Sequence, residues 1–263
     1  MTASLDKHVG RAERQRFADG KPVYRLGRVS FTVESRDAAF ERDLPRLLVR
    51  CRSDAEKIYP LQADNFRALL LKVLELHKDY LWISAACLLS PQGHKVLISG
   101  HSSAGKSTTA IALALRHGWK VLSEDLTGID ERTNRVLLFT TPYSLKSGTL
   151  ELLQETVNMQ PEPLVSGEWV PLTATHAESE CDTDFDLILF FGNSQKGEPL
   201  KKIECSAGEY VRLLLPCSNL LHDYGRTDKF AQYMRSTPCY QVFGGSLSER
   251  MTLILELTTG ACS

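Results

Sequence analysis

A phosphate-binding motif is the feature of this sequence with the most definite chemistry. Residues 100–107 read Gly-His-Ser-Ser-Ala-Gly-Lys-Ser and fit the pattern GxxxxGK[ST]. Glycine at Gly100 and Gly105 leaves room for successive backbone N–H groups to surround an anion. Lys106 offers a positive charge to the β- and γ-phosphates of a nucleotide, and the hydroxyl of Ser107 is a ligand for Mg²⁺. The motif therefore predicts a site for a nucleotide and Mg²⁺.

The rest of the loop is expected to line the same site. We assign nucleotide contacts to the remaining loop residues and to the first threonine after them, namely His101, Ser102, Ser103, Ala104 and Thr108. His101 receives no catalytic role, because a lone histidine in the variable part of such a loop is more often solvated. The alternative is a glycine-containing turn that only joins a strand to a helix. It is disfavoured because the flanking sequence supplies both elements in the order that the mechanism needs.

The sequence on both sides of the motif predicts this strand and this helix. Residues 95–99 form a nearly all-apolar run, typical of a strand buried on both faces. Residues 106–117 have apolar side chains at helical spacing, and Gly118 follows where a left-handed C-cap would end the helix. The helix N-terminus would then point its free N–H groups and the positive end of its dipole at the phosphates.

Two adjacent carboxylates, Glu124 and Asp125, lie in the next predicted strand, over residues 120–126. Strands of an open α/β sheet deliver functional residues at their carboxyl ends, and neighbouring side chains on a strand point to opposite faces. The two acids are therefore expected to have different roles. We assign Glu124, with Ser107, to Mg²⁺, and Asp125 to the orientation or deprotonation of an attacking hydroxyl. Exchanged roles, or a plain turn acid at Asp125, are the alternatives. Lys106, Glu124 and Asp125 are thus the predicted catalytic residues.

Other apolar patterns predict an α/β fold with a mixed sheet packed around the helix of the motif. Further strands are expected at residues 28–33, 81–90, 135–140, 185–191 and 211–215, and further helices at 40–49, 65–80, 147–154 and 224–234. We expect a β-rich or mixed N-terminal region over residues 1–60 and a P-loop domain over residues 61–263.

Composition narrows the range of partners. The chain has 31 basic and 32 acidic residues and a formal charge of −1, so its net charge gives no attraction to nucleic acid or to an anionic membrane. Its seven cysteines show no CxxC spacing and are expected to be reduced thiols. No window reaches the roughly 18 apolar residues that a membrane span requires, and the N-terminus has no apolar signal segment. We expect a cytoplasmic protein without a nucleic-acid or membrane partner; a second copy of the chain is a candidate partner.

The run VLISGHSSAGKSTTAIALALRHGWKVLSEDLTGID resembles the core of the HPr kinase/phosphorylase family, where a P-loop and its helix precede a strand with two adjacent acids. PYSLKSGTLELL (residues 142–153) and CYQVFGGSLSERMTLIL near the C-terminus are similar to divergent HPr-kinase-related proteins, including kinases associated with ribosomally made peptides such as lasso peptides. The resemblance covers about residues 65–255.

This resemblance implies a kinase core of the HPr-kinase/PEP-carboxykinase-like type. It implies ATP and Mg²⁺ as cofactors and transfer of the γ-phosphate to a serine hydroxyl of a peptide or protein, for which a ribosomally made precursor peptide is one candidate. The base of the family falls on Asp125, with Glu124 in place of the first aspartate.

Two departures limit what the resemblance implies. The chain has no counterpart of the proline- and asparagine-rich segment that follows the kinase core in the carrier-protein kinases. Carrier-protein kinases of the family have a histidine on the strand before the P-loop, where this chain has Ser84 and Ala85. Phosphorylation of the HPr carrier itself, and the reverse phosphorolysis, are therefore not expected.

Two further cations, Lys146 and Arg226, are candidates for contacts with substrate or phosphate. A solvated lysine and a surface ion pair are the competing interpretations.

Two other functions compete with the peptide kinase. A small-molecule kinase of the adenylylsulfate-kinase type also has a P-loop followed by a strand with an acid, but the tight acid pair favours the first hypothesis. A nucleotide switch or non-catalytic binding module would use the DxxG pattern at residues 125–128. That pattern follows the lysine too soon for a switch segment, and the chain has no NKxD guanine-reading motif.

Overall fold

The structure, a computed structural model, describes residues 17–18, 21–48, 57–77, 79–144, 147–157, 169–170, 175–195, 197–219, 231 and 235–260. The chain divides into two compact units. One comprises Met1–Lys78 with Pro161–Thr173, and the other Asp79–Gln160 with Ala174–Ser263. The fold is mixed α/β with several separate sheets, so the expected fold class is confirmed at that level.

The first unit is built on a three-stranded sheet, in which β4 pairs antiparallel with β3 and parallel with β5. Asp37 caps one helix by accepting hydrogen bonds from Ala39 N and Phe40 N, and Asn65 caps the other. The boundary predicted after residue 60 would cut through β5, whereas the compact unit continues to Lys78. The elements of this unit are β1 (Phe17–Ala18), β2 (Lys21–Pro22), β3 (Tyr24–Leu26), β4 (Val29–Glu34), α2 (Ala38–Leu47), β5 (Ile58–Gln62), α3 (Phe66–Glu75) and β13 (Trp169–Val170).

The second unit contains a six-stranded mixed sheet in the order β16-β17-β15-β8-β7-β9. These strands are β7 (Ala85–Leu89), β8 (Lys95–Gly100), β9 (Lys120–Ser123), β15 (Leu187–Phe191), β16 (Lys201–Glu204) and β17 (Cys239–Phe243). Strands β8, β15 and β17 are parallel, and β9 has the same direction because both β8 and β9 pair antiparallel with β7. The carboxyl ends of β8, β9, β15 and β17 therefore share one edge of the sheet.

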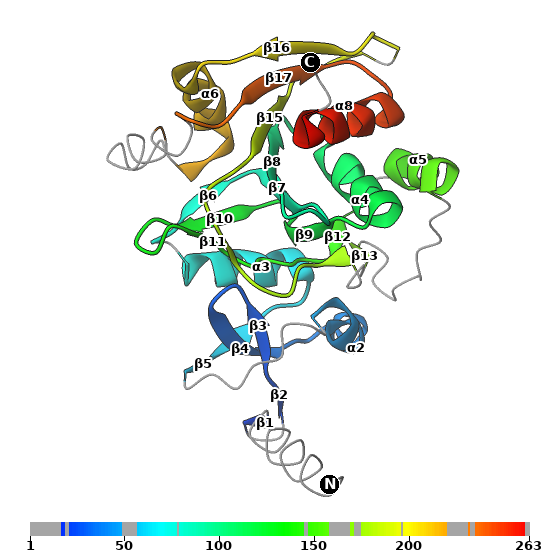
Figure 1. The fold of residues 1–263 in the computed structure, drawn as a ribbon. Coiled ribbons are helices and arrows are strands. Elements are labelled where there is room, and N and C mark those ends of the chain that lie inside the picture. Colours follow the sequence, from blue (N-terminus) through cyan, green and yellow to red (C-terminus); the bar gives the residue numbers. More distant parts are fainter. Residues whose placement is uncertain are drawn as a thin grey trace, which may run out of the picture. The chain divides into compact units, whose positions relative to one another are not determined.

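Helices cover both faces of this sheet. Helix α4 (Lys106–His117) packs on one face, with α5 (Ser147–Val157) and α8 (Leu247–Thr259) against it (Figure 1). Helix α6 (Ala207–Leu214) packs on the other face, followed by a short 3₁₀ helix, η3 (Leu215–Cys217).

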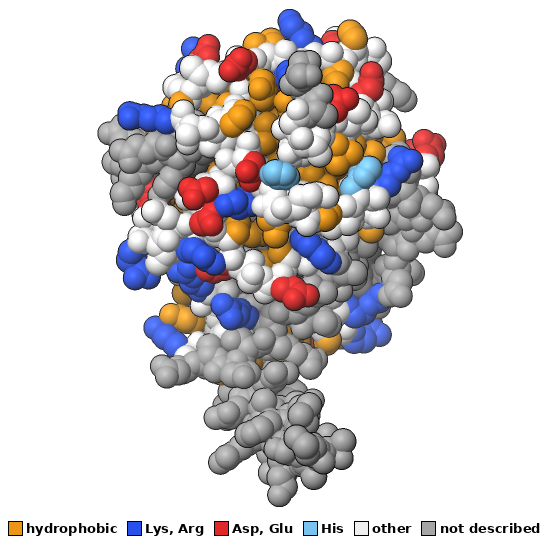
Figure 2. Space-filling view, in the orientation of Figure 1, with side chains coloured by type: hydrophobic (Ala, Val, Ile, Leu, Met, Phe, Trp, Pro, Cys, Tyr) orange, Lys and Arg blue, Asp and Glu red, His pale blue; other side chains and the backbone are white. Residues whose placement is uncertain are grey.

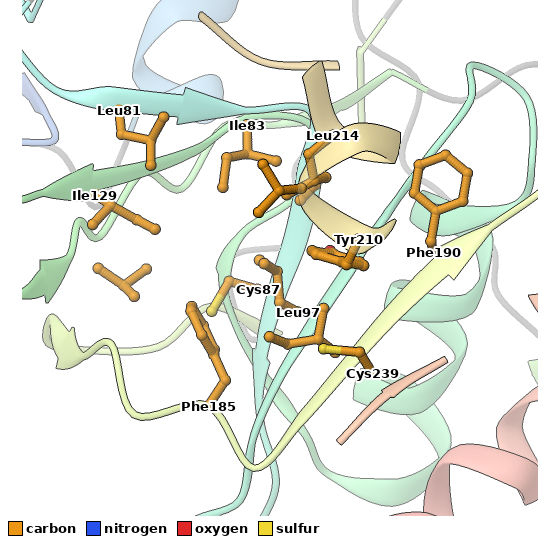
Figure 3. Close-up of a cluster of buried hydrophobic side chains, with 14 of the residues drawn as sticks. Leu81, Ile83, Cys87, Leu97, Ile129, Phe185, Phe190, Tyr210, Leu214 and Cys239 are labelled. Atoms are coloured by element: carbon orange, nitrogen blue, oxygen red, sulfur yellow. The ribbon is translucent and has the colours of Figure 1, made fainter. Parts of the chain in front are cut away.

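A cluster of buried hydrophobic side chains lies on the α6 side of the sheet. A second sheet, in the order β14-β11-β10-β6, contributes to it. Figure 3 shows side chains of β6 and β10 meeting those of β7, β8 and α6. The strands of this sheet are β6 (Leu81–Ile83), β10 (Thr127–Asp130), β11 (Arg135–Val136) and β14 (Cys181–Asp182), and the remaining strand of the unit is β12 (Tyr143–Ser144).

Several predicted elements are confirmed and others are corrected. The strand expected at residues 211–215 is wrong, because this segment belongs mostly to α6, which a capping box of Ser206 and Glu209 begins. The strand expected at 81–90 is interrupted at Ser84, and its two halves belong to different sheets. Of the strand expected at 135–140 only Arg135–Val136 is regular. The helix expected at 224–234 lies outside the described residues, apart from Ala231.

The surface carries charges of both signs, and the described cysteines are unpaired by disulfides. Basic and acidic side chains are interspersed on the face shown in Figure 2. The five cysteines in the described part of the chain are free thiols, as predicted: Cys87, Cys181, Cys205, Cys217 and Cys239. Within the described residues, none of the helices combines the length and the apolar character that a membrane crossing needs.

Candidate functional site

The predicted phosphate-binding loop joins β8 to α4, as the sequence indicated. Strand β8 ends at Gly100 and α4 begins at Lys106, with Gly105 as its N-cap. Gly105 has a φ of 94° and makes no side-chain cap at the N-terminus of α4, the end of a helix at which anions bind. Ser103 also adopts a positive φ, of 67°.

The glycines are required for a reason that the sequence did not reveal. Gly100 has a φ of 138°, and a Cβ there would lie 2.2 Å from the carbonyl oxygen of Phe191 on β15. A Cβ at Gly105 would lie 2.8 Å from Nη1 of Arg250. The approach at Gly100 is to backbone, which cannot move aside, and Gly105 is favoured by its positive φ, so both glycines are needed to form the loop as well as to admit an anion.

Gly100→Ala is therefore expected to lower the free energy of unfolding by about 2 kcal/mol or more, because the added methyl group would meet backbone in a disfavoured conformation. Urea unfolding followed by circular dichroism measures the change. Gly208→Ala is the matched control: a Cβ at Gly208, in α6, meets nothing within 4 Å, and alanine should stabilise the helix by about 0.5–1 kcal/mol. A Gly100→Ala protein as stable as wild type would contradict this reading of the loop.

Lys106 lies inside the loop rather than in solvent. Its side chain is 7% exposed, and Nζ donates hydrogen bonds of 3.0 Å to the carbonyl oxygens of Gly100 and His101. The ammonium group is thus held over the backbone of the loop, where an anion in the loop would meet it.

Glu124 and Asp125 follow β9, and the structure gives them different surroundings. The strand predicted over residues 120–126 is wrong in its bounds: β9 ends at Ser123, and both acids lie in the bend after it, with Glu124 3% exposed and Asp125 exposed. Burial and the charge of Asp125 raise the pKa of Glu124 to about 7, although a hydrogen bond with Ser107 and the charge of Lys106 act against the shift. The structure therefore brings Glu124, Ser107 and Lys106 together at the first turn of α4.

Tyr143 lies close to this group. It is fully buried, and its hydroxyl forms a 3.1 Å hydrogen bond with the hydroxyl of Thr175. Burial raises the pKa of Tyr143, and the nearby charge of Glu124 raises it further. Tyr143 thus lies near enough to Glu124 for the charge of that carboxylate to act on it, a position that the sequence gave no reason to expect.

A pocket of about 930 Å³ opens beside the loop, within the size range of small-molecule sites. It lies over the carboxyl ends of β15 and β17, whereas Glu124 and Asp125 follow β9 on the other side of β8. The lining residues are Ser102, Ser103, Ala104, Gly105, Thr108 and Thr109 of the loop and α4, Thr149 and Leu152 of α5, Asn193, Ser194, Gln195, Gly197, Glu198 and Pro199 after β15, and Gly245, Ser246, Leu247, Glu249 and Arg250 at the start of α8.

The other residues that the sequence predicted for the site have different surroundings. Thr108 is buried, and its hydroxyl donates to that of Thr149 at 3.4 Å. His101 is exposed, and its ring packs edge-on against that of Phe190, with centroids 5.3 Å apart. Lys146 and Arg226 both lie outside the described residues.

Arg250 is the residue at this site that sequence reasoning missed. Its guanidinium group comes from the first turn of α8 and donates to the carbonyl oxygen of Ala104 at 2.6 Å. The only local signal was the pattern Ser246-x-x-Glu249, which ends one residue before Arg250 and marks the start of a helix. That pattern says nothing about the loop that the arginine reaches.

The fold and the site together define an α/β protein with a glycine-containing loop between a strand and a helix, a buried acid beside it and an adjoining pocket. No family model and no curated protein matches the chain. Among solved structures, the HPr(Ser) kinase/phosphatase from Coxiella burnetii is similar at 12% identity, over 68% of this chain and 95% of that one, with a TM-score of 0.31. A similarity of that size carries no argument about activity, so the functional proposal rests on the geometry of the site.

Proposed function

We propose that this chain is an ATP- and Mg²⁺-dependent kinase with a core of the HPr-kinase/PEP-carboxykinase-like type, which transfers the γ-phosphate to a serine hydroxyl of a peptide or protein. One observation carries the proposal: Lys106, Ser107 and the buried carboxyl group of Glu124 meet at the uncapped N-terminus of α4. Nucleotide phosphates need a cation and a helix N-terminus, and the metal ion bound with them needs a hydroxyl and an acid.

The residues present fit Mg²⁺. In the described part of the chain no group of three or more His, Cys, Asp or Glu side chains could hold a metal ion. A nucleotide-bound Mg²⁺ needs only one or two protein oxygens, because phosphates and water supply the rest. Glu124 and Ser107 offer such hard oxygen ligands, and a nearby cation would favour the ionised form of a carboxyl group whose pKa is about 7. When bound, Mg²⁺ neutralises charge on the transferring phosphoryl group.

The residues of the site have different roles in the proposed reaction, according to where they lie. Lys106 and the first N–H groups of α4 bind and orient the phosphates. Asp125 is exposed beside Glu124, where it can accept the proton of an incoming hydroxyl. The phosphorus–oxygen bond to the acceptor forms as the bond to ADP breaks, and the hydroxyl proton passes to Asp125.

The exposure of Asp125 supports a macromolecular acceptor. A serine on a flexible polypeptide can reach an exposed carboxylate, whereas a small alcohol usually reacts in an enclosed site. A ribosomally made precursor peptide is the acceptor we favour, and a cytoplasmic location, where ATP is supplied, belongs to the same proposal.

The position of Gly128 argues against the nucleotide-switch alternative. Gly128, the last residue of the DxxG pattern, lies inside β10 opposite Trp82. A Cβ at Gly128 would lie 2.7 Å from the Trp82 ring, so this glycine serves the packing of the sheet. No comparable observation favours a switch.

Transfer of labelled γ-phosphate from ATP tests the acceptor class. Three reactions contain serine peptides encoded by neighbouring genes, small alcohols including free serine and adenylylsulfate, or no acceptor. We expect label on a peptide and none on its serine-to-alanine version. Label on a small alcohol would replace the proposal with the small-molecule kinase. Hydrolysis without an acceptor, with a preference for GTP, would replace it with the switch.

A further inference from the structure

Arg250 is held at the boundary between the loop and the pocket by contacts on several sides. Nε donates to the carbonyl oxygen of Gly244 at 2.8 Å, and Nη2 donates to Ser194 Oγ at 3.4 Å. Nη1 donates to the carbonyl oxygen of Ala104 at 2.6 Å, and the guanidinium carbon lies 5.0 Å from the centroid of the Phe191 ring. These contacts fix the orientation of the guanidinium group directly over the loop.

The charge of Arg250 is not neutralised by any carboxylate in the described part of the chain. Its hydrogen-bond acceptors are two backbone carbonyls and a hydroxyl, and the side chain is half-buried. A guanidinium group has five N–H donors, so these contacts leave one on Nη1 and one on Nη2. Burial lowers the pKa of Arg250, which is the mark of a cation that has lost water. A partly desolvated cation with two donors left beside a pocket is suited to an anion.

The sheet order indicates which part of a nucleotide would meet Arg250. Glu124 and Ser107, the proposed metal ligands, lie toward β9, whereas Arg250 and the pocket lie toward β15 and β17. A nucleotide with its terminal phosphate near the acids must leave the loop on the other side. Its inner phosphates would then pass the guanidinium group, and its nucleoside would enter the pocket.

We propose that Arg250 binds the inner phosphates of the donor nucleotide from the C-terminal helix, and that the adjoining pocket holds the nucleoside. This inference rests on the nucleotide-binding part of the proposed function but not on phosphate transfer. The first turn of α8 then belongs to the binding site, although most of the sequence of the second unit lies between the loop and α8. The two spare donors of the guanidinium group match two oxygens of a phosphate.

Binding of a series of ligands to the full-length protein tests the inference. Titration calorimetry compares ATP, ADP, AMP and adenosine on wild type and on Arg250→Gln. We expect the affinity for ADP and ATP to fall by about 10- to 100-fold, since a charge-assisted contact is lost, while the affinity for adenosine changes by less than about threefold. Arg250→Lys keeps the charge but lacks the planar guanidinium group with its paired donors. Its affinity for ADP should lie between those of wild type and Arg250→Gln.

The series separates phosphate binding from a purely structural role. An equal loss for adenosine and ADP would mean that Arg250 only shapes the loop and the pocket, and unchanged ADP affinity would exclude any contact with phosphate; either overturns the inference. If Arg250→Gln does not fold, the same series on Arg250→Lys decides. Wild type that binds ADP without phosphorylating any acceptor would contradict the kinase but not this inference.

Discussion

Lys106→Ala is expected to lower the rate of phosphate transfer by about 100- to 1,000-fold, because the loop would lose the buried charge that stabilises the transferring phosphates. Loss of nucleotide affinity should accompany the loss of rate, since the same charge binds the ground state. The measurement is kcat/KM for ATP at saturating acceptor, together with the Kd for ADP.

Two controls make this result specific. Lys120→Ala removes an exposed lysine from the nearby strand β9 and should leave kcat/KM within about twofold of wild type. Lys106→Met keeps an unbranched side chain over the carbonyls of Gly100 and His101 and should be as inactive as the alanine variant. Activity in either Lys106 variant within tenfold of wild type would exclude this lysine from the phosphate site.

Glu124→Gln is expected to make the metal-free protein more stable at neutral pH while it removes Mg²⁺-dependent transfer. The pKa of Glu124 is about 7 in the folded protein and 4.5 ordinarily. Below pH 4.5 the carboxyl group of Glu124 is protonated in both the folded and the unfolded state, so its ionisation does not lower the free energy of unfolding. Between pH 4.5 and 7 the folded state binds more protons, so the stability of wild type falls as pH rises and then levels off. The difference in pKa corresponds to about 3 kcal/mol.

Urea unfolding in EDTA between pH 4.5 and 8 measures this effect. The free energy of unfolding of Glu124→Gln should exceed that of wild type by up to about 3 kcal/mol at pH 8 and converge with it near pH 4.5. Asp125→Asn is the comparison variant: it keeps the buried carboxyl group and removes only the exposed neighbouring charge that contributes to its raised pKa, so it should raise stability at pH 8 by much less than Glu124→Gln. A glutamine variant less stable than wild type at pH 8 would show that the buried carboxyl group is structural.

The loop could be predicted from the sequence because its determinants are neighbours along the chain. Gly100, Gly105 and Lys106 lie between an apolar run and a helical pattern, and the structure has the expected strand and helix there. The adjacent acids were likewise visible, but which of them is buried depends on how the bend after β9 packs against α4. No local pattern could reveal that Glu124 faces Ser107.

Arg250 could not be predicted for a related reason. Its hydrogen bond to Ala104 spans 146 residues, and it exists because β15 and β17 place the start of α8 beside the loop. The error at residues 211–215 has a different origin. A five-residue segment with four apolar side chains fits a strand or a helix equally well, and the capping box at Ser206 and Glu209 was the signal that identifies α6.

The proposed function requires that this site transfers phosphate from Mg-ATP to a serine of a polypeptide. Its most direct test is the intact mass of a serine-containing precursor peptide after incubation with Mg-ATP and either wild type or Asp125→Asn. The proposed function predicts that wild type adds the mass of one phosphoryl group to the peptide, that Asp125→Asn adds it far more slowly, and that a serine-to-alanine peptide gains none. Equal rates for the two proteins would remove Asp125 from the mechanism. Unchanged peptide mass with a wild-type protein that binds ATP would contradict the peptide kinase itself.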